Sequence, residues 1–506
     1  MSRKKFCAAI FSAAFLFHSI SFAAESVTMS LDKAIDLALE NNHAITQYQT
    51  DREAAQWRLS EIRRNGGPRL SWQSSAYYIG GKRYKEDQEY YARYHFYYDD
   101  EDWERTYNDG NDLPKRAQYQ SEVYHSLSLS MPLYTGGNLE NQIQGAEYAL
   151  NVADLRLEYA KQYVRYQATE AYLQVLQRND NIKVQQEAVN FLQSHLDSVQ
   201  FQYEVGTVAK ADVLSTSVQL ANYKRNLNSA WGDYESAVAT LNNVIGLPVD
   251  TVLVTDEDLQ NTPYPLNEEE CTEYALEHRP DGIAALYSVR QAQTTVDGRK
   301  SGYRPSINAQ ANASSTGEAF FDSKHINEYW QIGLSMQWNL FDNGITDAQI
   351  KQAKLAEEKA ESQLKQQLDQ IRLDVHTAYI ELLTAEKNVN VSAAAVTEAE
   401  DAYEIAKVRY NEGVDTNLNV MDAQEKVAVA RNNYYNSLYT YNVSKAKLDR
   451  VIGIPVQIDA FRYVSAVENG KKSSPKALES SDIINPPVEE QEDEPVDISQ
   501  LFVELP

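Results

Sequence analysis

The chain has 506 residues, of which 43% are hydrophobic and 24% charged, and its formal net charge is −26 at pH 7. This length and apolar content suffice for a large core or for two similar halves. The acidic excess argues against nucleic-acid binding, because affinity for nucleic acid comes largely from Lys and Arg side chains on phosphates.

Residues 1–23 have the pattern of a secretory signal peptide. A basic start is followed by an apolar stretch from Phe6 to Ile20 and a small-x-small cleavage site at Ser21-Phe22-Ala23. Cys7 leaves with this segment, so Cys271 is the single cysteine of the mature chain and no intramolecular disulfide is expected. The remaining sequence has no run of about 18 apolar residues, the length of a transmembrane helix.

Much of the sequence occurs twice. A shift of 207 positions places Leu133 on Leu340, and it also relates Gly137 to Gly344, Tyr172 to Tyr379, Tyr203 to Tyr410, Gly206 to Gly413, Gly246 to Gly453 and Pro248 to Pro455. Upstream the shift is 237, from Pro68 to Pro305. This repeat is longer than the 20–50 residues of a solenoid unit. It predicts a duplicated half-molecule, with a first repeat at 24–250, a second at 251–460 and an acidic, Pro/Ser/Glu-rich tail at 461–506.

Each copy contains a stretch in which apolar and polar residues alternate, at 123–131 and at 329–338, and each has an upstream partner, at 70–78 and 307–313. Period two with one apolar face is typical of a transmembrane barrel strand, and a soluble surface hairpin is the alternative interpretation. Four strands are fewer than the roughly eight that close a barrel, so a barrel must be shared between chains.

The first copy is 30 residues longer than the second between its strands, within the Tyr-rich loop 77–124 that carries the acidic run Asp99 to Asp102. Long loops of such barrels lie outside the cell, which makes this an expected extracellular loop. It either caps the pore, contacts lipopolysaccharide through bridging cations, or simply varies as surface loops do.

Long helices are predicted at 138–205 and 346–412, which lack proline, and each is followed after a glycine by a second helix, at 210–243 and 417–450. At about 1.5 Å per residue, a 65-residue helix is on the order of 100 Å long. Apolar residues recur at three- and four-residue spacing, which predicts coiled-coil packing. The predicted buried stripes are Leu155, Tyr159, Tyr163 and Tyr166 in the first copy and Leu364, Leu368, Ile371, Val375 and Ala378 in the second.

Five kinds of motif follow one another in fixed order: the opening segment 31–42, the prolines Pro68 and Pro305, the strand-to-helix junctions 133–137 and 340–344, the turns 203–206 and 409–413, and the helix ends 245–248 and 452–455. Together they resemble the TolC-like outer membrane factors, also called outer membrane efflux proteins, over nearly all of residues 25–460. The resemblance implies an α+β membrane protein in which long coiled-coil helices form a periplasmic α-barrel and four strands per chain contribute to a trimeric transmembrane β-barrel.

The resemblance also implies a function and partners. The chain is expected to be a passive exit duct of a tripartite efflux or type I secretion system, opened by partner proteins at its periplasmic tip. Expected partners are two further copies in a homotrimer, a periplasmic adaptor (membrane fusion) protein, an inner-membrane transporter and outer-membrane lipid, with no nucleic acid. Gly206 and Gly413 are expected to supply positive φ at the hairpin tips, where Tyr203 and Val205 also lie and where the adaptor docks.

In the family the tip carries a pore constriction and gate. By position Tyr410 keeps a network tyrosine and Asp422 keeps an aspartate of the second ring, whereas Asn419 replaces an aspartate of the first ring. Asp415 stands where an arginine is often found, and Asp212 keeps the usual partner of that arginine. An Asp212–Asp415 pair would repel, so the closed state is expected to be looser or held differently. Three copies of Asp422 around an axis would attract cations, although a solvated helix residue is the plain alternative.

Catalysis is not expected. The eight histidines are scattered without metal-ligand spacing, and the sequence has no phosphate-binding glycine loop and no nucleophile elbow. No metal or cofactor is therefore expected. Two alternatives to a duct remain at this point: a periplasm-spanning structural protein or adhesin of the outer membrane without gated conductance, and a soluble periplasmic coiled-coil adaptor without a barrel.

Overall fold

A computed structural model describes residues 27–80, 119–255, 257–317 and 327–468. The expected signal peptide, positions 81–118 of the long loop and the tail from 469 onward lie outside the described residues. The chain divides into two compact units, one formed by Met1–Thr46, Ala160–Cys271 and Asp374–Val456, and the other by Gln47–Tyr159, Thr272–Leu373 and Gln457–Pro506. None of the helices in the described ranges combines the length and apolar character that a membrane-crossing helix needs.

Two helical hairpins dominate unit 1. The first joins α4 (Asn138–Glu204) to α5 (Lys210–Ile245), and the second joins α8 (Ile345–Asn411) to α9 (Asn417–Ile452). The predicted bounds of all four helices are confirmed to within two residues. Helices α4 and α8 each have 67 residues and begin in unit 2, whereas α5 and α9 each have 36 and lie within unit 1. Unit 1 also contains α1 (Leu31–Asn41), the start of α2 (His43–Arg64) and the start of α6 (Glu268–His278).

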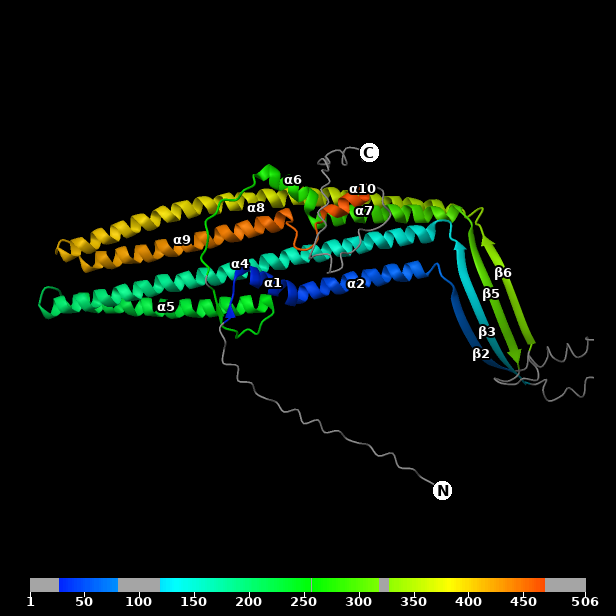
Figure 1. Cartoon of the computed structure of the whole chain (residues 1–506), viewed down its shortest axis with the longest axis horizontal. Helices are drawn as coiled ribbons and strands as arrows, with labels where there is room; N and C mark the ends of the chain where they lie inside the picture. The colour runs from blue at the N-terminus through cyan, green and yellow to red at the C-terminus, as the bar shows by residue number, and fades with distance from the viewer. Residues whose placement is uncertain (1–26, 81–118, 256, 318–326, 469–506) are drawn as a thin grey trace, which may run out of the picture. The chain divides into compact units, whose positions relative to one another are not determined.

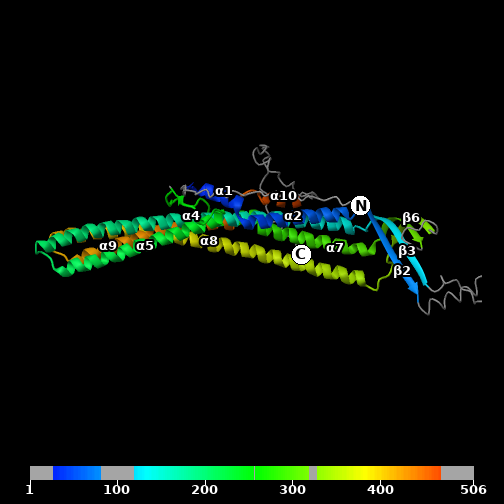
Figure 2. The same cartoon turned by 90° about the horizontal axis from the view of Figure 1, so that it is seen from below.

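The two hairpins pack against each other through a shared apolar cluster. Helices α4, α5 and α9 lie side by side there (Figures 1 and 2). The cluster consists of Val184, Ala188, Val189 and Leu192 from α4, Leu220 and Tyr223 from α5, and Met421 and Ala428 from α9. Because its members come from both hairpins, neither hairpin buries its apolar face alone.

The N-terminal strand β1 (Val27–Thr28) pairs in parallel with β4 (Leu253–Val254), in the linker after α5. Tyr172 of α4 supports this small sheet, since its hydroxyl lies 3.2 Å from the Met29 carbonyl and 2.8 Å from a Glu257 carboxylate oxygen. The pairing therefore attaches the start of the described chain to the linker between the two hairpins.

Unit 2 contains one antiparallel sheet of four strands in the order β2-β3-β5-β6 (Figure 1). Its strands are β2 (Arg69–Gly80), β3 (Tyr119–Tyr134), β5 (Ser306–Gly317) and β6 (Asn327–Gln337). The predicted pairing of upstream and downstream strands is confirmed in both copies, with Leu70 opposite Leu129 and Ala313 opposite Trp330. Alternate side chains form an exposed apolar face, which includes Leu70, Trp72, Leu127, Leu129, Trp330, Ile332, Leu334 and Met336.

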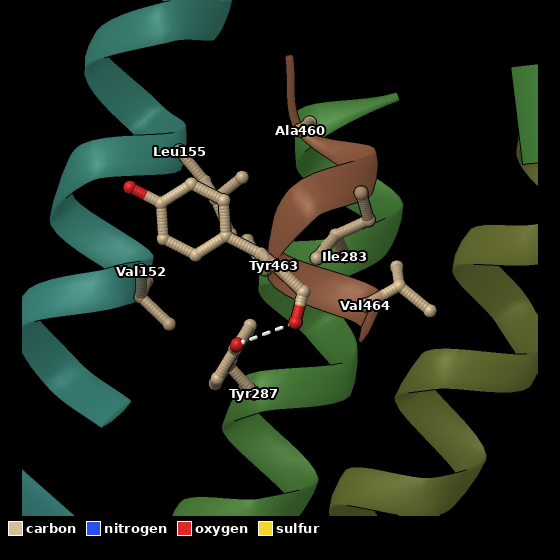
Figure 3. Packing of buried hydrophobic residues seen from close by; sticks show 8 residues of the cluster. Val152, Leu155, Ile283, Tyr287, Ala460, Tyr463 and Val464 are labelled. Atoms are coloured by element: carbon tan, nitrogen blue, oxygen red, sulfur yellow. Dashed lines mark hydrogen bonds between the residues drawn. The ribbon is translucent and has the colours of Figure 1, made fainter. Parts of the chain in front are cut away.

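The helical part of unit 2 is formed by most of α2, the first parts of α4 and α8, α7 (Pro280–Arg299), a 3₁₀ turn η2 (Lys300–Tyr303) and α10 (Phe461–Glu468). Helix α10 packs between α4 and α7, where Tyr463 and Val464 join a buried cluster with Val152, Leu155 and Ile283 (Figure 3). The Tyr287 hydroxyl donates to the Tyr463 carbonyl at 2.8 Å. Residues 461–468, assigned to the tail on composition, thus form a packed helix.

The predicted helical stripes have different outcomes in the two copies. In α8 the stripe from Leu364 to Ala378 is buried throughout, as predicted. In α4 Leu155 is buried, whereas Tyr159 and Tyr163 are exposed in the single chain. The Arg450 guanidinium lies over the Tyr163 ring, 5.6 Å from its centroid. This cation–π contact covers one face of the ring, and the polar hydroxyl tolerates water, so Tyr163 can lie at the protein surface.

Candidate functional site at the hairpin tips

Each hairpin of unit 1 turns through a glycine in the left-handed region, as the sequence predicted. Gly206 has φ +84° and Gly413 has φ +74°. The Thr207 amide donates to the Gln202 carbonyl at 2.9 Å and the Gly206 amide to the Tyr203 carbonyl at 3.0 Å, which is the Schellman arrangement. The second turn repeats both bonds from Val414 and Gly413.

Apolar side chains at both turns face solvent in this chain. Tyr203 is 43% exposed and Val205 59% exposed, and Val414 beside the second turn is also exposed. The four tip residues predicted from the resemblance, Tyr203, Val205, Gly206 and Gly413, therefore all lie at or beside the turns.

Asp415 and Asp212, which would repel each other as a pair, have separate partners in this chain. The Asp415 carboxylate contacts the amide of Asn419 and lies 3.3 Å from the Arg409 guanidinium. These contacts, led by the bond from Asn419, hold the pKa of Asp415 below its usual range. The Asp212 carboxylate instead accepts from the Ala209 amide at 3.3 Å, at the start of α5. Arg409 and Asn419 thus provide the charge and the donor that offset Asp415 within the second hairpin.

Tyr410 connects the two hairpins. Its hydroxyl donates to the Gln202 side-chain oxygen of α4 at 2.8 Å. Burial, and secondarily the charge of Asp212, raises the pKa of Tyr410, so the hydroxyl remains protonated and able to donate. The tyrosine predicted to belong to a tip network does form a bond between hairpins.

Asp422 lies on α9, about one turn after Asn419. Its carboxylate is 3.0 Å from the Lys426 ammonium. Both side chains are exposed in the single chain. Asp422 and Asn419 are three residues apart and so occupy neighbouring turns of one helix face. The structure brings Asn419, Asp415 and Arg409 together and leaves Asp422 in a separate ion pair.

A histidine that the sequence patterns did not single out joins the two hairpins near the tip. His195 of α4 has its Nε2 2.6 Å from Oδ1 of Asn417, the first residue of α9. Asn417 in turn donates to the Thr216 hydroxyl of α5 at 2.9 Å. The signal was present in the sequence: Leu192 and Val199, three residues before and four after His195, belong to a buried stripe, and a polar residue on such a stripe needs a partner.

The described residues offer no arrangement for metal binding, because no three His, Cys, Asp or Glu side chains among them lie close enough to hold an ion. The site instead consists of hydrogen bonds and ion pairs that join helices. Such contacts hold helices in one arrangement or, when broken, release them into another.

Comparison with known proteins identifies this architecture. The family model described as outer membrane efflux protein matches residues 34–247 and 272–454. The outer membrane efflux protein BepC of Brucella suis is 22% identical over 326 residues, covering 64% of this chain and 71% of the relative. The alkaline protease secretion protein AprF of Pseudomonas aeruginosa is 22% identical over 355 residues, with coverages of 69% and 73%.

Solved structures show the same fold. The Campylobacter jejuni CmeC outer membrane channel aligns with a TM-score of 0.68 at 16% identity, covering 94% of this chain and 98% of the channel. The outer membrane protein VceC of Vibrio cholerae aligns with a TM-score of 0.65 at 17% identity, covering 84% and 96%. Since the family model matches well over half of the sequence, the chain belongs to the outer membrane efflux protein family, a family of outer-membrane channels rather than enzymes.

Proposed function

We propose that the protein is the passive exit duct of a tripartite efflux or type I secretion system, built from three copies that share one β-barrel in the outer membrane and extend their helices into the periplasm. The observation that carries this proposal is the open four-stranded sheet of unit 2. Its apolar face is exposed, and its outer strands β2 and β6 each have one unpaired edge within the described sheet.

Such a sheet requires further strands in lipid. Backbone groups at a free edge have no water to bond with in the hydrocarbon region, and each unsatisfied group costs several kcal/mol there. Pairing β2 of one copy with β6 of the next satisfies both edges. The number of copies, three, comes from the family resemblance, and it gives a barrel of sufficient size to leave an open channel.

The helical part supports a duplicated, tubular design. Helices α4 and α8 have equal lengths, as do α5 and α9, which agrees with two repeats at 24–250 and 251–460. In the proposed trimer, Asn419 and Asp422 line the periplasmic constriction, while Tyr410, Asp415 and Asp212 take part in holding it closed. Three carboxylates from Asp422 would then form a cation-attracting ring.

A periplasmic adaptor docks at the tips around Tyr203, Val205, Gly206 and Gly413, and an inner-membrane transporter supplies the energy. The exposed apolar side chains at the turns fit a protein partner that covers them. Relatives of both efflux and secretion type match this chain, so the choice of cargo is assigned to the transporter.

Two measurements on the purified protein test this function. The mass in detergent is expected to be that of a trimer, whereas a monomer would leave open edges in lipid and remove the shared barrel. In planar bilayers the trimer is expected to conduct ions and to be blocked by divalent cations from the periplasmic side. A trimer without conductance would favour the spacer or adhesin alternative.

Asp422→Ala tests the constriction. This substitution is expected to weaken divalent block, because it removes the carboxylate ring. Asp401→Ala, at an exposed position of α8, is the matched control and is expected to leave block unchanged. Equal block in wild type and Asp422→Ala would remove Asp422 from the constriction.

A further inference from the structure

The two hairpins of the sheet pair their strands in the same register. In the first, Arg69 of β2 lies opposite Ser130 of β3, and in the second, Ser306 of β5 lies opposite Gln337 of β6. A shift of 237 carries Arg69 onto Ser306, and a shift of 207 carries Ser130 onto Gln337. These are the shifts that relate the two copies in the sequence. The repeat therefore extends to the pairing of individual residues.

The junction between the hairpins supplies a register for two free edges. Within the chain, β3 of the first repeat pairs with β5 of the second, and Leu127 lies opposite Ala313. The same shifts carry β3 onto β6 and β5 back onto β2, so Leu127 corresponds to Leu334 and Ala313 to Ala76. Strands β6 and β2 are the outer strands of the described sheet (Figure 1). A junction between copies that repeats the junction within the chain places Leu334 opposite Ala76 of the next copy.

Side-chain size supports this register independently. Between β3 and β5, large side chains lie opposite alanines in the pairs Leu127–Ala313, Leu129–Ala311 and Met131–Ala309. In the register between copies, Leu334 again lies opposite an alanine, Ala76, and Met336 lies opposite Ser74. The small partner leaves room for the large side chain to pack across the strands. A slip of two residues would instead place Leu334 opposite Tyr78.

The register also keeps the apolar face of the sheet continuous. Opposed residues lead across the sheet from Leu70 through Leu129 and Ala311 to Ile332. The register between copies continues from Ile332 to Tyr78 of the next copy, which shares a strand face with Leu70 because an even number of residues separates them. A slip of one residue would move one strand's apolar set to the polar side.

Both kinds of junction then have the same stagger. Ala311 corresponds to Ser74, four positions after Leu70, and Tyr78 lies four positions after Ser74. A closed barrel has a fixed total stagger, and equal steps let every strand take the same tilt. Any other register between copies would give the barrel junctions of two different kinds.

We propose that β6 of one copy pairs with β2 of the next in the register that the internal repeat supplies. The paired residues are Leu334 with Ala76, Ser335 with Ser75, and Gln337 with Gln73. A second copy of this chain covers the free edge, because its β2 is the strand that the repeat relates to β5. This register rests on the proposed sharing of one barrel between copies.

Cysteine substitutions at four positions of the polar face test the register. The matched combinations are Ser75→Cys with Ser335→Cys and Gln73→Cys with Gln337→Cys, and the crossed combinations are Ser75→Cys with Gln337→Cys and Gln73→Cys with Ser335→Cys. Cβ atoms of directly opposed residues are about 4.5–5.5 Å apart, whereas diagonal neighbours are about 7–8 Å apart, too far for a disulfide. On mild oxidation of the full mature protein in detergent, the matched combinations are expected to crosslink copies about tenfold faster than the crossed ones. Denaturing gel electrophoresis measures the product.

A disulfide within one chain is the matched control. Ser335 corresponds to Ser128 and Ser75 to Asn312, and Ser128 and Asn312 lie opposite each other in the described sheet. Ser128→Cys with Asn312→Cys is therefore expected to close within the chain under the same oxidation. Cys271 is buried and does not compete. The two matched combinations are independent, so one remains if the other does not assemble, and a short bifunctional thiol reagent provides a second readout on both.

The outcomes separate the register from the duct. Faster crosslinking of a crossed combination would overturn the register and indicate strands slipped by two residues. No product between copies in either matched combination, with oxidant and with reagent, would also overturn it. Matched crosslinks that stop at a covalent trimer would support the register and the three-copy duct. Matched crosslinks with another number of copies, or in a trimer that does not conduct, would support the register and count against the duct.

Discussion

Arg431 of α9 binds the carboxylate of Glu400 on α8 through two nitrogens, with Nε 2.8 Å and Nη2 2.7 Å from Oε1. Its remaining nitrogen, Nη1, contacts the carboxylate of Glu187 on α4. The planar guanidinium provides donors in a fixed fork, which a lysine ammonium does not. One side chain thus joins three helices of unit 1, well away from the turns.

Arg431→Met is expected to lower the free energy of unfolding by about 1 kcal/mol and the Tm by roughly 2 °C. The estimate is modest because the Arg431 side chain is 34% exposed and water screens the pair. Thermal unfolding followed by circular dichroism measures it. Arg372→Met is the control, since Arg372 pairs with Asp369 of its own helix at 2.8 Å and should cost less. Equal losses would mean that joining three helices adds nothing.

Removal of α10 is expected to destabilise unit 2. A chain ending at Glu468 keeps the helix and serves as the reference, whereas a chain ending at Asp459 exposes Val152, Leu155 and Ile283 to water. Loss of the Tyr463 side chain alone corresponds to about 3–5 kcal/mol by analogy with large-to-small core substitutions. Hydrogen exchange along α7 (Pro280–Arg299) is the measurement, and equal protection in the two chains would contradict a packing role for α10.

Two glycines with similar backbone angles are expected to respond differently to alanine. At Gly206 an added Cβ would meet open space, so Gly206→Ala should cost only the left-handed backbone penalty, about 1–2 kcal/mol. At Gly246, φ +76°, an added Cβ would lie 2.5 Å from Asn41 Cβ on α1. Gly246→Ala therefore also displaces α1 and should lower the Tm further. Identical Tm values for the two variants would show that Asn41 can move away from the added Cβ at no measurable cost in stability.

Acid is expected to loosen the tip. Burial lowers the pKa of His195 below its ordinary value of 6.5, with the bond to Asn417 opposing in part. The packed tip therefore binds the proton less well than an opened tip, and its stability falls as the pH drops below about 6.5. Hydrogen exchange of the amides at 417–424, corrected for its intrinsic pH dependence, should be faster at pH 5.5 than at pH 7.5. His195→Gln should remove this difference.

Among the side chains that contact His195, none other is expected to change its protonation between pH 5.5 and pH 7.5. Tyr410 of α8 stays protonated throughout this pH range because its pKa is raised, and Asn417 of α9 does not titrate. Asp212 of α5 contacts Thr216, the other partner of Asn417, through its backbone carbonyl. A pH effect of equal size in His195→Gln would assign the response to a carboxylate such as Asp415 instead.

The strands and the hairpin turns could be predicted from the sequence, because they depend on the pattern of neighbouring residues. Strand alternation around Leu129 and Trp330 and the glycines Gly206 and Gly413 rest on side-chain period and on backbone sterics, which neighbours in sequence already specify. The partner of Tyr410 was not predictable in this way, because Gln202 lies on another hairpin. Such contacts depend on how helices pack.

The features that the sequence patterns missed also depend on packing between elements that are far apart in sequence. Helix α10 follows a proline-containing linker and precedes an acidic stretch, and its burial depends on its packing between α4 and α7, which no local window reveals. The exposed Tyr159 and Tyr163 have core spacing, yet an amphipathic tyrosine also suits a boundary. The spacing of His195 from Leu192 and Val199 indicates that it needs a polar partner. The identity of that partner, Asn417, could not be predicted, because it lies on α9.

The pairing of Val27 with Leu253 also constrains the order in which the chain acquires its structure. Contacts between residues far apart in sequence form late, because the intervening loop must first be closed. A chain that emerges N-terminus first holds β1 without its partner until the whole α4–α5 hairpin and the linker beyond it have followed. We therefore expect the first strand of the described chain to gain its partner late in folding.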